Sequence, residues 1–216
     1  MTASRLDIAA LRQEYMRSGL SEADALADPI VQFERWLQAA LDAGLPLPNA
    51  MTLATVSAAG APSARIVLLK GIEAGCFVFY TNYESRKGRE LALQPQACLV
   101  FLWSSLERQV RVEGSVEMVP DSVSDQYWHG RPLGARHSAW ASAQSATVAN
   151  RGALETELAA MRERHGEAPP RPAHWGGYRV VPHTIEFWQG RADRLHDRLL
   201  YRSVPGRGWK IERLAP

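Results

Sequence analysis

The sequence predicts a mainly β protein with flanking helices, an α+β fold built around an antiparallel barrel. From residue 51 onward, short apolar runs alternate with turn residues, and no regular helical crossovers separate most of them. The chain has 216 residues, of which 46% are hydrophobic and 22% are charged, so it can bury the core of one compact domain. We therefore expect a single domain over residues 1–216, with a helical N-terminal segment over about 1–44.

The N-terminal segment carries the signals of a helix. Asp28 is suited to cap the helix and Pro29 to occupy its first position, while Gly44 ends it. Between these signals, apolar side chains recur at helical spacing, at Ile30, Phe33, Leu37 and Leu41.

The rest of the chain divides into strands, turns and short helices. Strands are predicted over residues 51–57, 63–70, 76–81, 97–103, 108–119, 178–182, 184–190, 197–204 and 209–214. Turns are predicted over residues 58–62, 71–75 and 205–208, and a β-bulge is predicted at Gly114. Further helices are predicted over residues 85–94, 121–129 and 152–165. Short strands joined by tight turns favour antiparallel pairing of the Greek-key type.

Composition and motifs exclude several classes of function. The net charge of +2 is too small for binding nucleic acid through bulk electrostatics. Cys76 and Cys98 lie in apolar runs without disulfide or metal spacing, which suits free thiols in a reducing cytoplasm. No apolar run is long enough to span a membrane, and no dinucleotide, P-loop, serine-hydrolase or zinc motif occurs. We expect a cytoplasmic protein without metal, nucleic-acid or membrane partners.

One stretch combines cations with hydroxyl groups and a helix start, as phosphate recognition requires. Arg65 and Lys70 bracket RIVLLK, and a second group follows at the next strand end: Tyr80, Thr81, Arg86 and Lys87. Taken singly, each can instead be an ordinary solvated charge. Because residues 65 and 70 differ by an odd number, a regular strand would point them to opposite faces. Either the strand twists or bulges, or the two side chains contact different groups.

Two further groups of residues each have a structural explanation as well as a functional one. QYWHGRP presents Tyr127, His129 and Arg131 where a helix ends, and a capped helix end explains it equally well. FWQGRADRLHDR offers a cradle for a planar anionic ring, made of Trp188, Arg191, Arg194, His196 and Arg198. A surface ion-pair network with Asp193 and Asp197 is the alternative for that stretch.

Over almost its whole length the chain resembles the pyridoxine/pyridoxamine 5′-phosphate oxidase family. The resemblance rests on RIVLLK, FYTNYESRKGREL, LERQVRVEG, YWHGRP, WGGYRV, IEFWQGRADRLHDR and WKIERLAP. It implies an FMN-binding split β-barrel and a homodimer with flavin mononucleotide (FMN) at the subunit interface. It also implies FMN-dependent oxidation of pyridoxine or pyridoxamine 5′-phosphate to pyridoxal 5′-phosphate, with O2 as the electron acceptor.

The resemblance also assigns residues to each ligand. To FMN it assigns Arg65, Ile66, Val67, Leu68, Leu69, Lys70, Tyr80, Thr81, Arg86 and Lys87. Further FMN contacts, largely from the partner subunit in this family, match Gln109, Gln144, Ser145, Trp188 and Arg198. The substrate phosphate matches Lys70, Tyr127 and Arg131, and the substrate ring matches Arg194, Leu195 and His196. An N-terminal segment that can cover the site matches Arg12, Gln13, Glu14 and Tyr15.

Arg194 and His196 are the expected catalytic residues, with the identity of the general base left open. Two positions depart from the family pattern: Ala135 stands where a phosphate-binding serine is frequent, and Leu47 where an acidic residue is common. These departures bear on substrate affinity more than on reaction type. The alternatives are a related flavin oxidase of the phenazine-pathway type and a non-catalytic FMN or pyridoxal-phosphate binder. A small basic RNA-binding module comes last, because the chain lacks its charge and aromatic pattern.

Overall fold

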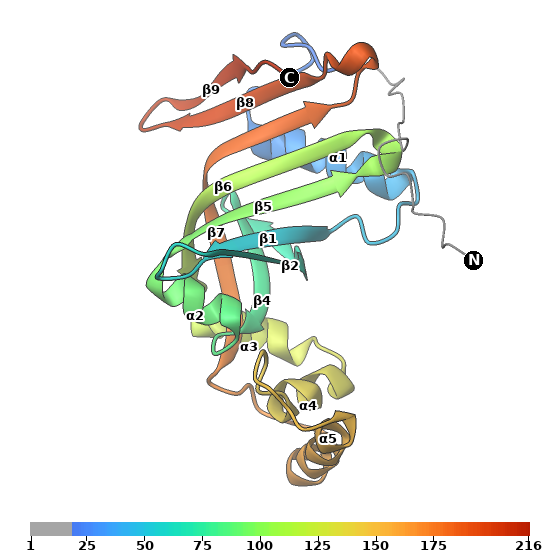
Figure 1. Ribbon diagram of the computed structural model, residues 1–216, viewed down its shortest axis with the longest axis vertical. Coiled ribbons are helices and arrows are strands. Elements are labelled where there is room, and N and C mark those ends of the chain that lie inside the picture. Colours follow the sequence, from blue (N-terminus) through green and yellow to red (C-terminus); the bar gives the residue numbers. More distant parts are fainter. Residues whose placement is uncertain (1–18) are drawn as a thin grey trace, which may run out of the picture.

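A sheet of nine strands, all paired antiparallel, forms the centre of the computed structural model, which describes residues 19–216 (Figure 1). The main path runs β2-β1-β5-β6-β7-β4-β3, and β8 and β9 extend from β7. The strands are β1 (Ala50–Val56), β2 (Pro62–Leu68), β3 (Gly71–Glu73), β4 (Cys76–Asn82), β5 (Gln96–Trp103), β6 (Arg108–Met118), β7 (Trp175–Gln189), β8 (Asp197–Val204) and β9 (Gly208–Arg213). The predicted antiparallel architecture is confirmed. The residues Arg12–Tyr15 lie outside the described part of the chain.

Strand β7 organises the sheet. Along one edge it pairs with β6, and along the other it pairs with β4 through residues 175–180 and with β8 through residues 184–189. The sequence predicted two strands here, and the structure has one. Pro182 lacks a ladder N–H and is tolerated because it lies opposite Gly114, where the register shifts. The predicted bulge at Gly114 is confirmed, and a Cβ there would collide with the carbonyl of Val181.

Five α-helices and two short 3-10 helices flank this sheet in residues 19–216. They are α1 (Pro29–Asp42), α2 (Arg86–Leu93), α3 (Asp121–His129), α4 (Leu133–Ala141), α5 (Arg151–His165), η2 (Ser104–Leu106) and η3 (Ala192–Arg194). The N-cap prediction holds, because Asp28 Oδ1 accepts a 2.8 Å hydrogen bond from the amide of Ile30. The predicted extension of this helix upstream is wrong for residues 19–28, which form turns and irregular chain. There the backbone of Leu20 bonds to Asp197 and Arg213 instead of to a helix.

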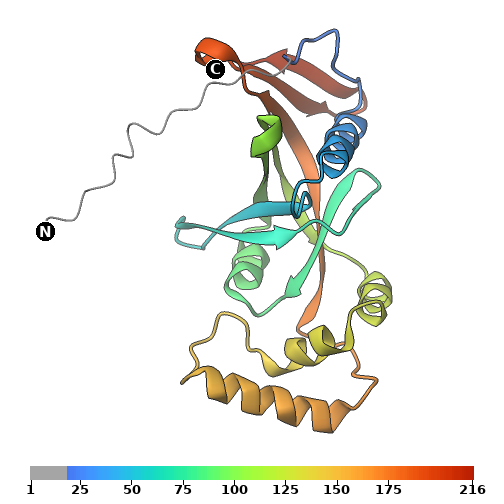
Figure 2. The same cartoon turned by 90° about the vertical axis from the view of Figure 1, so that its right-hand side faces the viewer.

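Aromatic side chains hold α1 against the sheet. The ring of Phe33 lies 5.0 Å from that of Phe77 and 4.8 Å from that of Phe101, and all three side chains are fully buried. Trp36, one turn further along α1, meets Phe187 of β7 edge to face at 5.2 Å. Figures 1 and 2 place α4 and α5 at one end of the long axis and β8 and β9 at the other.

The predicted turn over residues 71–75 is shorter in the structure. Residues 71–73 form β3 and pair with β4, which leaves Ala74 and Gly75 as the turn. Both have positive φ, 48° and 77°, as a two-residue hairpin turn requires. Strand β2 ends at Leu68, so Lys70 lies beyond the regular strand and the alternation rule does not separate it from Arg65. Among residues 19–216, no helix is long and apolar enough to cross a membrane.

Candidate active site

A hollow of about 870 Å³ opens where β2, β4 and the helices α2, α3 and α4 meet. Most of the residues predicted for the flavin and for the substrate phosphate line it: Arg65, Ile66, Val67, Leu68, Lys70, Tyr80, Thr81, Lys87, Tyr127, Arg131, Ala135 and Gln144. Arg65 and Lys70 thus reach one hollow, which resolves the question raised by their odd spacing. Leu69 is buried behind it. Glu73, Val123 and Gln126 also line the hollow and were not predicted.

Lys87 is the most buried cation of the hollow, at 8% exposure. Its ammonium donates to Thr81 Oγ1 at 3.0 Å, to Ser85 Oγ at 3.2 Å and to Gln144 Oε1 at 2.7 Å. Burial, reinforced by the positive charge of Arg65, lowers the pKa of Lys87 to about 8. Three neutral acceptors satisfy its protons without neutralising its charge, so the position is suited to an anion.

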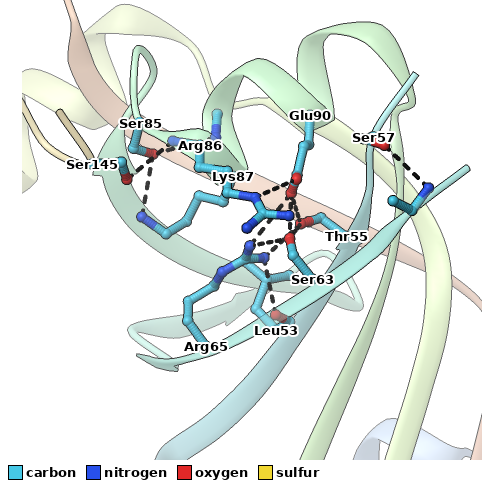
Figure 3. A network of polar contacts seen from close by, with 12 residues as sticks. Leu53, Thr55, Ser57, Ser63, Arg65, Ser85, Arg86, Lys87, Glu90 and Ser145 are labelled. Atoms are coloured by element: carbon cyan, nitrogen blue, oxygen red, sulfur yellow. Dashed lines mark hydrogen bonds and ion pairs between the residues drawn. The ribbon is translucent and has the colours of Figure 1, made fainter. Parts of the chain in front are cut away.

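A buried carboxylate that the sequence analysis did not single out joins the two neighbouring arginines (Figure 3). Glu90 Oε1 accepts a 2.9 Å bond from Arg86 Nε, and Glu90 Oε2 lies 3.3 Å from Arg65 Nη2. Thr55 and Ser63 donate to the same Oε2 at 2.5 and 2.6 Å. Burial alone would raise the pKa of Glu90, but these hydrogen bonds outweigh it and lower the pKa to about 2. The spacing of four residues between Arg86 and Glu90 was the available signal.

Nearly parallel aromatic rings support the other side of the hollow. The ring of Tyr80 stacks on that of Tyr127 at 3.8 Å with an interplanar angle of 6°, and Trp175 lies 5.6 Å from Tyr80 at 12°. Arg131 lies over Trp175, with its Cζ 4.6 Å from the ring centroid. Strands β4 and β7 therefore position the phenol of Tyr127 and the guanidinium of Arg131 through one stack.

Arg131 is suited to receive an anion. Its Nη2 donates to the carbonyl oxygen of Ala135 at 3.2 Å, whereas its buried Nε has no hydrogen-bond partner among residues 19–216. Burial lowers the pKa of Arg131. A bound phosphate would accept a hydrogen bond from Nε, and its negative charge would raise the pKa of Arg131 again. A second hollow of about 440 Å³ adjoins the first and shares Arg131 and Ala135 with it.

Five of the remaining predicted residues lie on β6, β7 and β8 or in the loop between β7 and β8. Gln109 pairs with Trp188, which in turn pairs with Arg198 across the strands. Arg198 Nε donates to the buried carboxylate of Glu186 at 2.7 Å, and Arg111 Nη2 lies 2.7 Å from the other oxygen of Glu186. The ring of His196 lies 4.7 Å from that of Trp188. We call Gln109, Trp188, Arg194, His196 and Arg198 the β7–β8 cluster.

No residue of the β7–β8 cluster lines the hollow of the same chain. Gln144 and Ser145, by contrast, lie beside the cations of their own chain: the amide of Arg86 donates to Ser145 Oγ at 3.1 Å. Leu195 is 70% exposed in the loop between Arg194 and His196.

Comparison with known proteins gives this arrangement its context. The profile described as "Pyridoxamine 5'-phosphate oxidase" matches residues 37–165, and that described as "Pyridoxine 5'-phosphate oxidase C-terminal dimerisation region" matches residues 175–216. A pyridoxine/pyridoxamine 5′-phosphate oxidase of Burkholderia cenocepacia (strain HI2424) is 58% identical over 211 residues, covering 97% of this chain and 99% of the relative. The protein of that name in Cupriavidus taiwanensis is 59% identical over 209 residues, with the same coverage.

Two solved structures are also similar to this chain. PhzG from Burkholderia lata, in complex with tetrahydrophenazine-1-carboxylic acid, is 35% identical with a TM-score of 0.84, covering 90% of this chain and 95% of PhzG. A pyridoxamine 5′-phosphate oxidase-related FMN-binding protein from Nostoc punctiforme is 19% identical with a TM-score of 0.69, covering 85% and 97%, and supports the fold alone.

Sheet topology and matches together define an oxidase-type protein with an FMN-binding split-barrel fold. The chain belongs to the pyridoxamine 5′-phosphate oxidase family.

Proposed function

We propose that this protein oxidises pyridoxine 5′-phosphate or pyridoxamine 5′-phosphate to pyridoxal 5′-phosphate, using FMN and passing the electrons to O2. The observation that carries the proposal is a single hollow lined by four cations: Arg65, Lys70, Lys87 and Arg131. We assign them to two groups, Arg65 with Lys87 and Lys70 with Arg131. Two cationic groups suit two phosphorylated ligands, one for the cofactor and one for the substrate.

The residues present fit FMN. Lys87 and Arg65 would bind its phosphate together with Arg86, since the ammonium of Lys87 donates to three neutral acceptors and the start of α2 adds backbone donors. When bound, FMN supplies the hydride-accepting chemistry that amino-acid side chains lack. The double variant Arg86→Ala with Lys87→Ala should lose FMN during purification, and an equally yellow preparation would contradict this assignment.

The substrate phosphate would lie against Arg131, Tyr127 and Lys70. The buried Nε of Arg131 would gain its missing acceptor there. A phosphate bound at this point positions the ring for reaction, and positioning supplies much of the rate in such reactions.

We propose that the β7–β8 cluster completes the hollow of a second copy in a homodimer. The dimerisation-region profile covers residues 175–216, which include Trp188, Arg194, His196 and Arg198. His196 Nδ1 accepts a 3.1 Å hydrogen bond from the amide of Arg191, so the neutral ring carries its proton on Nε2. The imidazole would then donate to the substrate ring rather than take a proton from it. Arg194 would stabilise negative charge on that ring.

The second candidate is an oxidase acting on a carboxylated, non-phosphorylated ring. The likeness to PhzG in complex with tetrahydrophenazine-1-carboxylic acid supports it. The two cations Lys70 and Arg131 favour a phosphate ester instead, because a dianion compensates two positive charges better than one carboxylate does.

The test is oxygen uptake by purified protein reconstituted with FMN. We expect uptake with pyridoxine 5′-phosphate or pyridoxamine 5′-phosphate and none with unphosphorylated pyridoxine at equal concentration. Uptake with a tetrahydrophenazine carboxylate alone would favour the second candidate. Flavin binding without uptake on any of these compounds would identify a non-catalytic binding protein and overturn the proposal.

A further inference from the structure

The guanidinium of Arg213 connects the first described residues of the chain to its last strand, β9. Arg213, at the end of β9, donates to both carboxylate oxygens of Glu22, at 2.7 and 2.9 Å. It also donates to the carbonyl oxygen of Leu20 at 3.1 Å and to Asp197 Oδ1 at 2.7 Å. A bidentate pair with two further bonds uses the planar donor fork of arginine in a way that lysine cannot reproduce.

Asp197 extends the connection to the loop that precedes β8. Its second oxygen, Oδ2, accepts a 2.9 Å bond from the amide of Leu20 and lies 3.7 Å from Arg191 Nε. Asp197 follows His196 directly, and its side chain is only 17% exposed. Leu20 is buried in the core, and a Cβ on Gly19 would collide with Arg191. Residues 19–22 are thus packed tightly against the Arg191–Asp197 loop.

The loop has a backbone that needs support from outside itself. Asp193 and Arg194 adopt left-handed conformations in succession, with φ of 54° and 61°. Residues other than glycine disfavour this region, so the surrounding contacts must hold it. The amide of Gly190 bonds to the carbonyl of Glu107 at 2.8 Å at one end of the loop, and Asp197 anchors the other end.

We infer that Glu22, Asp197 and Arg213 form a clamp that makes the root of the N-terminal segment and the Arg194–His196 loop one positioning unit. The inference rests on the proposed function, in which Arg194 and His196 contact the substrate ring. Residues 19–22 then hold the loop that carries Arg194 and His196 in the conformation that meets the substrate ring. Arg213 and Asp197 act as positioning residues.

Arg213→Met tests the clamp, because it removes the charge and keeps most of the aliphatic stem. We expect the KM for the phosphorylated substrate to rise at least fivefold, with the FMN dissociation constant unchanged. Arg213→Lys should recover only part of the loss. Glu22→Gln, at a side chain 58% exposed, should fold normally and raise KM in the same direction if Arg213→Met is too unstable to assay. Glu212→Gln is the matched control, because it removes ion pairs with Arg202 and Lys210 on the same hairpin.

A second readout does not depend on turnover. Trypsin cleavage after Arg191 and Arg194, in the loop that the clamp holds, should be several-fold faster in Arg213→Met and Glu22→Gln than in wild type or Glu212→Gln when followed by mass spectrometry. Unchanged KM and unchanged cleavage in both variants would overturn the clamp. If wild type bound FMN but oxidised no phosphorylated vitamer, the proposed function would fail, while the cleavage rates would still decide whether the clamp exists.

Discussion

The ammonium of Lys87 donates a 2.7 Å hydrogen bond to the side-chain oxygen of Gln144, which lies 57 residues later in the chain. The bond joins the start of α2 to the segment between α4 and α5, and it holds a buried cation at the hollow. Burial lowers the pKa of Lys87 to about 8, with a smaller contribution from the charge of Arg65. At alkaline pH, the binding of an anion beside Lys87 must therefore be coupled to the protonation of Lys87.

Affinity for FMN should fall above about pH 8, because deprotonated Lys87 no longer attracts the phosphate dianion. The expected limit is about tenfold per pH unit for one linked proton. Titrations monitored by flavin fluorescence between pH 7 and pH 10 would measure it. Riboflavin, which lacks the phosphate, should show no such dependence, and Lys87→Met should abolish it for FMN. Parallel pH curves for the two flavins would refute the assignment of Lys87.

Glu90→Gln should destabilise the fold, since it replaces the buried charged acceptor shared by Arg65, Arg86, Thr55 and Ser63. We expect a loss of about 1–3 kcal/mol at pH 7 in urea unfolding. The folded pKa of about 2 lies below the usual 4.5, so the stabilisation by Glu90 is complete above about pH 4.5 and is lost as pH falls toward 2. The difference between variant and wild type should shrink over that window.

Glu155→Gln provides the control for this measurement. Its carboxylate also pairs with an arginine four residues away, but both side chains are exposed, at 62% and 88%. Its loss should stay within about 0.5 kcal/mol. Equal effects of the two substitutions at pH 7 would show that the Glu90 network contributes no more than a surface pair.

Local sequence signals predicted the parts of the fold that depend on local chemistry. The cap at Asp28 and the bulge at Gly114 were read directly from residue type and pattern. Helix α4 was missed because His137 is its only buried residue and it has no side-chain cap, so no apolar period marks it. The single strand β7 was divided at Pro182, because the bulge that accommodates this proline is a property of the β6–β7 pair.

The sequence predicted which residues form the candidate site, but not which of them lie together. The cations of RIVLLK and SRKGREL lie together because β2 and α2 meet, which no local pattern encodes. Glu90 was missed since an acidic residue in a helix is ordinarily a surface charge, and only the tertiary contacts to Thr55 and Ser63 reveal its burial. Glu186, which binds Arg198, was missed because its burial in strand β7 likewise follows only from the tertiary structure.

Arg194→Ala should reduce turnover by about 10²-fold and leave FMN bound, because the residues proposed to bind the FMN phosphate, Arg65, Arg86 and Lys87, are unchanged. Single-turnover reduction of the flavin by pyridoxine 5′-phosphate would measure the loss without interference from reoxidation. Arg207→Ala replaces an exposed arginine in the turn between β8 and β9 and should leave the rate unchanged. An unaltered rate in Arg194→Ala would remove this residue from the mechanism.

Ala135→Ser should tighten binding of the phosphorylated substrate. Ala135 lines the hollow, and its carbonyl oxygen already accepts from Arg131 Nη2, so a hydroxyl at this position would lie near the proposed phosphate. One additional net hydrogen bond of about 1 kcal/mol corresponds to an approximately fivefold lower KM. Steady-state oxygen uptake against pyridoxine 5′-phosphate concentration would measure it.

The effect of Ala135→Ser must depend on the phosphate if the assignment is right. Ala141→Ser, at the end of the same helix and outside the lining of either hollow, should leave KM unchanged. The FMN dissociation constant should be the same in both variants, because the hydroxyl is added on the Arg131 side and not beside Lys87. A tighter complex with FMN and an unchanged KM would instead assign the Arg131 side of the hollow to the cofactor, since only the ligand whose phosphate lies there can gain the new hydrogen bond.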